Sequence, residues 1–123
     1  MNTATLNAGG LALSSAGPDN VIGNGDDVLL SGGTLSLRHN TNNTTFADAS
    51  TTISASSTIN VDNNGSGTGN TLKLGAVNVS AATTATLTTT NGNTYALGLG
   101  AVTQSPTTAT TLTIANAAPL TMA

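Results

Sequence analysis

Apolar residues alternate with small polar residues in short segments along the chain, and this period-two pattern predicts β-strands. The sequences TLSL at residues 34–37, TLKL at 71–74 and TLTI at 111–114 show the alternation. In such a strand, every second side chain points to the same face of the sheet. Glycine- and asparagine-rich turns separate the segments. We therefore expect strands at residues 4–7, 10–14, 20–23, 27–31, 34–38, 44–47, 51–55, 58–62, 71–75, 77–80, 86–90, 95–99, 110–115 and 120–122.

Similar apolar pairs recur at intervals of about two dozen residues, which is a typical coil length for a solenoid of stacked strands. The spacings are 24 residues from Leu11 to Leu35, 24 from Leu35 to Ile59, 25 from Leu72 to Leu97, 23 from Val79 to Val102 and 23 from Leu97 to Leu120. We therefore expect residues 1–123 to form a single segment of parallel β-solenoid (β-helix) with about five coils. The main alternative is an antiparallel sandwich, which needs more large core side chains than the single Phe and single Tyr present.

The solenoid hypothesis also predicts which residues face inward and which regions protrude. Two regions with few apolar residues, near residues 40–52 and 62–70, are expected to form protruding loops. Asparagine side chains in the turns are expected to form hydrogen bonds between stacked coils. The residues expected to point inward are Leu11, Leu13, Leu35, Leu37, Ile59, Val61, Leu72, Leu74, Val77, Val79, Leu97, Leu99, Leu112 and Ile114.

The composition supports an all-β class and excludes several functions. The chain has 25 Thr, no Glu and only 6% charged residues, so it cannot build the charged face of an amphipathic helix. Two cations and a net charge of −3 argue against binding to nucleic acid. No run approaches the roughly 18 apolar residues of a membrane helix, so we expect no membrane insertion. The absence of Cys excludes disulfides and thiolate metal sites.

Three phrases resemble repeats of a known kind of surface protein. Residues 3–13, 33–37 and 109–114 are similar to the β-strand repeats of autotransporter passengers and of filamentous-haemagglutinin-like proteins. This resemblance implies a right-handed parallel β-helix, and it implies an extracellular or cell-surface location in bacteria. No targeting segment is visible at the start of the chain, so we expect a piece of a longer secreted protein.

One motif could bind a metal ion. Residues 23–29 match G-x-G-x-D-x-L, most of the calcium-binding nonapeptide of β-rolls, and Asp19, Asp26 and Asp27 are the candidate calcium ligands. The match occurs once, whereas such a site takes ligands from two successive turns. The simpler interpretation is a turn between two strands, and no other cofactor is expected.

The sequence offers little for catalysis. His39 is the single histidine. A catalytic triad would combine it with Ser31 or Ser36 and with Asp48, but no sequence motif supports this combination. The chain also lacks the clustered basic and acidic residues that a polysaccharide-cleaving groove requires. We therefore expect a protein that is not an enzyme.

The functional hypothesis follows from the two ends of the chain. Both termini have strand-like sequences with the same alternation as the interior, so neither is expected to close the stack. We expect a structural subunit or repeat whose main partner is another copy of itself, stacked end to end into a rod or filament. The alternative is an adhesin segment that binds a cell-surface or glycan partner through its loops.

Overall fold

A computed structural model describes residues 3–6, 11–13, 27–46, 50–80, 84–104, 112–116 and 118–123. The described residues form strands and no helix. They therefore include no helix that is long and apolar enough to span a membrane. The strands are β1 (Thr3–Leu6), β2 (Leu11–Leu13), β3 (Asp27–Ser31), β4 (Thr34–Arg38), β5 (Thr44–Phe46), β6 (Ser50–Ala55), β7 (Ser57–Asp62), β8 (Thr71–Leu74), β9 (Val77–Val79), β10 (Ala85–Asn91), β11 (Ala96–Leu99), β12 (Val102–Gln104), β13 (Leu112–Asn116) and β14 (Leu120–Met122).

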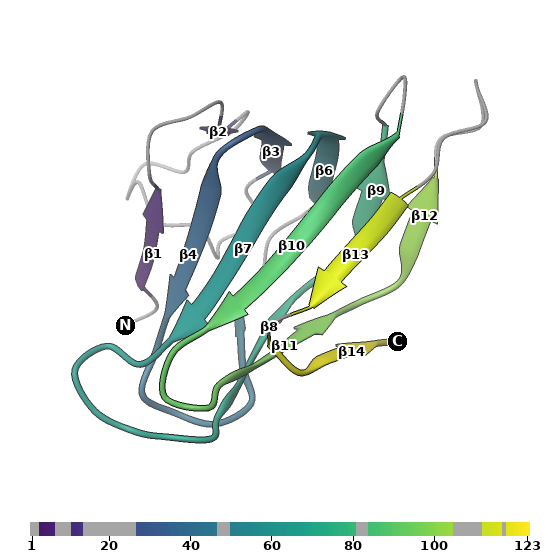
Figure 1. The fold of residues 1–123 in the computed structure, drawn as a ribbon. Coiled ribbons are helices and arrows are strands. Elements are labelled where there is room, and N and C mark those ends of the chain that lie inside the picture. The colour runs from purple at the N-terminus through teal and green to yellow at the C-terminus, as the bar shows by residue number, and fades with distance from the viewer. Residues whose placement is uncertain are drawn as a thin grey trace.

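The strands wind into a parallel β-solenoid, which confirms the predicted fold class (Figure 1). Within the described residues, sheet A has the order β1-β4-β7-β10-β13, sheet B the order β12-β9-β6-β3-β2, and sheet C the order β14-β11-β8-β5. The strands from β3 onward pair in parallel. Three full turns lead from β3 to β12, and β13 and β14 continue into a fourth, so the solenoid has fewer coils than expected.

The N-terminal strands account for the difference in coil number. β1 pairs antiparallel with β4, and β2 pairs antiparallel with β3. Leu11 therefore lies opposite Leu30 and does not stack in a parallel coil on Leu35. The expectation that the N-terminal sequence continues the parallel stack is wrong. Alternation of apolar and polar residues is common to both kinds of pairing, so it carries no information on strand direction.

The strand register confirms most of the predicted spacings. Leu35 lies opposite Ile59, and Leu97 lies between Leu72 and Leu120. Val102 instead lies opposite Val77, two residues before its expected partner. Coil length also varies, because Thr88 and Thr58 are opposite each other although they are 30 residues apart. The extra residues lie in the loop after β7 and in the connection between β9 and β10, where insertions lengthen the coil without disturbing the strands.

The core occupies the interior between the three sheets. Strands β7 and β10 alternate between buried and half-buried residues along most of their length, as a strand with one inward face should. The predicted inward residues that are buried are Leu35, Leu37, Ile59, Val61, Leu72, Leu74, Val77, Val79, Leu97 and Leu99. Ile114 is half-buried, and the side chains of Leu11, Leu13 and Leu112 lie outside the described residues. Buried apolar residues that were not predicted are Val28, Leu30, Phe46, Ile53, Ala85, Leu87, Tyr95 and Ala118.

One predicted loop is shorter than expected. Within residues 40–52, β5 and the first part of β6 are strands, and Phe46 is completely buried. The loop before β5 spans residues 39–43. The second predicted loop, near residues 62–70, is present, and its residues 64–69 are exposed.

Candidate functional site

Two regions of the solenoid are candidates for interaction with a partner. The first is the loop corner, which we define as residues 39–43, 62–70 and 91–95. These three segments connect sheet A to sheet C in successive coils. The second is the C-terminal edge, which we define as β12, β13 and β14. These strands are the last in sheets B, A and C.

Asn40 ties the first loop of the corner to the second. Its Oδ1 accepts hydrogen bonds from the main-chain nitrogens of Asn64, at 2.7 Å, and Ser66, at 3.2 Å. Its Nδ2 donates to the Asn64 main-chain oxygen at 3.1 Å. The Nδ2 of Asn70 donates to the Asn40 main-chain oxygen at 2.9 Å. Asparagine amides thus form hydrogen bonds between coils, as expected, and those of Asn40 are made with main-chain groups.

Tyr95 lies beneath the corner and connects three coils. Its side chain is completely buried, and its Oη donates to the main-chain oxygen of His39 at 2.8 Å and accepts from Asn70 Nδ2 at 2.9 Å. A Cβ on Gly67 would lie only 2.8 Å from this hydroxyl, and Gly67 also has a φ of +103°. Glycine at this position therefore allows the second loop to close over the phenol.

Asp62 makes the second set of contacts between coils. Its Oδ1 accepts from Asn93 Nδ2 at 2.7 Å and from the Asn63 main-chain nitrogen at 2.8 Å, and its Oδ2 lies 3.5 Å from Arg38 Nη1. Burial raises the pKa of this carboxyl, but the hydrogen bonds and the Arg38 charge outweigh that effect and lower the pKa from its usual 3.8. A Cβ on Gly92 would overlap the Asp62 carboxylate.

The structure describes three of the four residues considered for a triad, namely His39, Ser31 and Ser36. The Nδ1 of His39 accepts from the Thr41 main-chain nitrogen at 3.1 Å and lies 2.8 Å from Thr44 Oγ1, so the ring is engaged within its own loop. Ser36 is 4% exposed within β4, and Ser31 ends β3. Asp48 lies outside the described residues.

The structure does not test the candidate calcium site, because most of it lies outside the described residues. Asp19 and Asp26 lie outside the described residues, and Asp27 is the first residue of β3, where its backbone is opposite Ser50. Elsewhere in the part of the chain that the structure describes, no three His, Cys, Asp or Glu residues form a group that could hold a metal ion.

The C-terminal edge leaves its part of the core uncovered, in contrast to the first coil. In the first coil, the inward apolar side chains of β3, β4 and β5 are at most 1% exposed, whereas Thr44, in the row of Leu72, is half-buried. In the last coil, Val102, Ile114 and Leu120 are only half-buried, and Met122 is 56% exposed. The antiparallel strands β1 and β2 extend sheets A and B beyond the first coil, whereas no described strand follows β12, β13 or β14. Among the described residues, the last coil therefore leaves more of its apolar side chains exposed than the first coil does, and we call its edge the open end.

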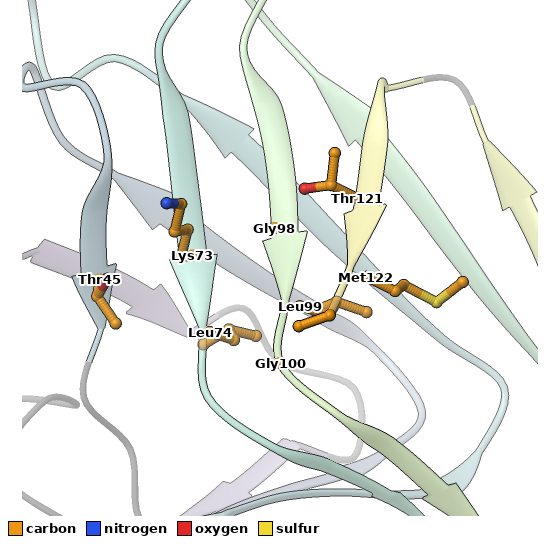
Figure 2. A pocket seen from close by; sticks show the side chains of 9 residues that line it. Thr45, Lys73, Leu74, Gly98, Leu99, Gly100, Thr121 and Met122 are labelled. Carbon is orange, nitrogen blue, oxygen red and sulfur yellow. The ribbon is translucent and has the colours of Figure 1, made fainter.

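A groove of ≈310 Å³ borders the open end on sheet C (Figure 2). The floor of the groove is a row of paired residues from four neighbouring strands, Thr45, Lys73, Gly98 and Thr121. A Cβ on Gly98 would lie 2.9 Å from Lys73 Cγ, so the lysine stem crosses the glycine. Figure 2 shows Met122 on the free edge strand beside this row. Lys73 is the single charged residue among those lining the groove.

Charged residues are confined to the first 73 residues of the chain. Residues 74–123 contain no Asp, Glu, Lys, Arg or His, so every charged side chain lies at or before Lys73. Exposed sheet edges are usually protected against pairing by charged residues. The strands of the C-terminal edge carry no such residue, and neither do β1, β2 and β5 at the other edges of the three sheets. Charge therefore does not distinguish the two ends.

Comparisons with protein-family models, curated proteins and solved structures found no match to this chain. The fold and the contacts themselves define the class of protein as a parallel β-solenoid with an amide-rich corner and one open end.

Proposed function

We propose that this chain is a non-enzymatic structural β-solenoid subunit that lengthens into a rod by joining another solenoid at its C-terminal edge. The observation that carries the proposal is the contrast in core burial between the two ends. The inward apolar side chains of the first coil are at most 1% exposed, whereas Met122 in the last coil is 56% exposed. Covering a large apolar side chain is favourable, so an edge of this kind favours association.

The contacts in the loop corner support a structural role. Asn40 and Asn70 use their amides in hydrogen bonds between successive coils, and the side chain of Tyr95 is buried beneath them. These groups stiffen the stack, which suits a rod. The alternative role, adhesion to a cell or glycan through this corner, receives less support because the same amides are already occupied. The resemblance to surface β-helix repeats favours an extracellular or cell-surface location.

The proposal is tested by placing a charge on the open end. Size-exclusion chromatography with light scattering would compare the chain with Met122→Asp and with Thr68→Asp, which adds the same charge to an exposed position of the loop corner. We expect the chain and T68D to associate with rising concentration. We expect M122D to remain monomeric, since burying an unpaired carboxylate weakens association by about a hundredfold or more.

Circular dichroism would first establish that both variants keep the β-sheet signal of the parent chain. If all three folded proteins are monomeric, or if M122D associates as strongly as T68D, the proposed function fails.

A further inference from the structure

We propose that Asn64 is a site of slow self-modification, in which its side-chain amide is lost as ammonia and the residue becomes aspartate or isoaspartate. The sequence Asn64-Gly65 lies in the loop after β7, and both residues are exposed. Figure 1 shows this loop, between β7 and β8, extending beyond the other two loops of the corner. The inference is independent of the proposed association at the C-terminal edge.

The reaction joins the main chain of Gly65 to the side chain of Asn64. Hydroxide removes the proton from the Gly65 nitrogen, which then forms a bond to Cγ of Asn64. The bond from Cγ to Nδ2 breaks, and Nδ2 takes a proton from water and leaves as ammonia, so hydroxide is regenerated. Water opens either carbonyl of the resulting five-membered succinimide, which gives aspartate or isoaspartate. Glycine favours the reaction because it has no Cβ to hinder the nitrogen.

The structure protects a second Asn-Gly sequence from this reaction. The chain has three such sequences, at residues 24–25, 64–65 and 91–92, of which the first lies outside the described residues. Asn91 ends β10, and its Nδ2 donates to the main-chain oxygen of Tyr95 at 2.6 Å. The Gly92 nitrogen donates to the main-chain oxygen of Val61 in the neighbouring coil at 3.0 Å. Both reacting groups are therefore held in hydrogen bonds, and the coil must open locally before they can meet.

The main-chain nitrogen of Gly65 is held much less firmly. It donates to Oδ1 of Asn63, within the same loop, at 3.3 Å. This distance is longer than that of a usual N–H···O hydrogen bond, and the loop is exposed, so water replaces the bond readily. A Cβ on Gly65 would have no atom within 4 Å, which shows that the space beside the glycine is open. Hydroxide can therefore reach this nitrogen while the strands remain paired.

The modification would disturb the contacts that Asn40 makes on both sides of the reacting peptide bond. Its Nδ2 donates to the Asn64 main-chain oxygen at 3.1 Å, and its Oδ1 accepts from the Ser66 nitrogen at 3.2 Å. In isoaspartate the chain runs through Cγ, so it gains one main-chain atom, and the former main-chain carbonyl becomes a carboxylate. One amide can then no longer span both groups. The link between the first two loops of the corner therefore loosens as the protein ages.

Peptide mapping of the incubated chain tests the site, with Asn91 as an internal control. The folded chain would be kept at mildly alkaline pH, and a second sample would be kept unfolded in urea. Trypsin cleavage after Arg38 and Lys73 places Asn64 in peptide 39–73 and Asn91 in peptide 74–123. Fragmentation by mass spectrometry assigns each change to one asparagine. In the folded chain we expect Asn64 to react at least about tenfold faster than Asn91, whose hydrogen bonds must first open. In urea the two sites should react at similar rates.

The comparison also defines the results that would overturn the inference. It fails if Asn91 reacts as fast as Asn64 in the folded chain, or if Asn64 reacts no faster than the neighbouring Asn63. Neither result bears on association at the C-terminal edge, which is measured separately.

The variant N64Q tests the consequence for the loop corner. Glutamine keeps the main-chain groups that bond to Asn40, but its longer side chain would need a six-membered ring, which forms far more slowly. After equal incubation, urea denaturation should show a larger loss of stability in the parent chain than in N64Q. Equal losses in the two proteins would show that reaction at Asn64 does not loosen the corner.

Discussion

The phenol oxygen of Tyr95 donates a 2.8 Å hydrogen bond to the main-chain oxygen of His39, which lies 56 residues earlier in the chain. Two turns of the solenoid separate these residues, and Asn70 from the intervening coil donates to the same phenol. The bond therefore crosses the corner along the solenoid axis, at right angles to the strands. It complements the sheet ladders, which join only adjacent coils.

Replacing Tyr95 with Phe tests this connection. The change keeps the buried ring and leaves the His39 oxygen without its donor, so we expect the free energy of unfolding to fall by about 1–2 kcal/mol. Urea denaturation would measure the loss. In an N70A background the same change should cost less, because one of the two phenol contacts is already gone. Equal costs in both backgrounds would contradict the coupling.

The lowered pKa of Asp62 predicts a dependence of stability on pH. Because the folded pKa lies below the usual value of 3.8, the ionised carboxylate stabilises the fold above that pH, and its contribution is lost as the pH falls through the folded pKa. In D62N this contribution is absent. Urea denaturation should therefore show a stability difference between the chain and D62N that is largest near neutral pH and shrinks in acid. A difference that stays constant with pH would contradict the account.

Gly92 allows the Asp62 carboxylate to approach the third coil. A methyl group at this position would overlap the carboxylate, so we expect Gly92→Ala to displace it from Asn93 and to destabilise the fold by about 1–3 kcal/mol. Thermal or urea unfolding would measure the effect. In a D62A background the displaced group is missing, and the cost of G92A should become small. A cost that is unchanged by D62A would show that Asp62 is not the obstacle.

Thr94 offers a site where stability should increase. Its φ of +59° lies in the left-handed region, which is unfavourable for a β-branched residue. Asparagine tolerates this conformation better, so Thr94→Asn should raise the free energy of unfolding by about 1 kcal/mol. Thr68→Asn is the matched control, since Thr68 is also exposed in the corner but is not among the described residues with positive φ. If T94N and T68N change the free energy of unfolding equally, the gain does not come from relief of backbone strain at Thr94.

The alternation of residues in the sequence was sufficient to predict the strands and the inward face of most coils. β3, β4 and β14 have the predicted bounds, because each contains two apolar residues two positions apart that mark its inward face. β12 (Val102–Gln104) was not predicted as a strand, because it has one apolar residue and is held mainly by its pairing with β9.

Strand direction and the corner network could not be predicted in the same way. The antiparallel pairing of β1 depends on the path of the chain before β3, and period-two alternation contains no information about it. Tyr95 was noted as one of two aromatic residues, but its partners His39 and Asn70 come from other coils. Only the three-dimensional stacking of loops with different lengths brings them together.

The central claim is that the solenoid lengthens by joining another solenoid at its C-terminal edge. Sedimentation equilibrium of the full chain over a wide range of concentration tests it most directly. The account predicts that the average mass rises with concentration above the chain mass of 11.9 kDa in the parent chain but not in M122D. A mass of the parent chain that stays at 11.9 kDa at every concentration would contradict it.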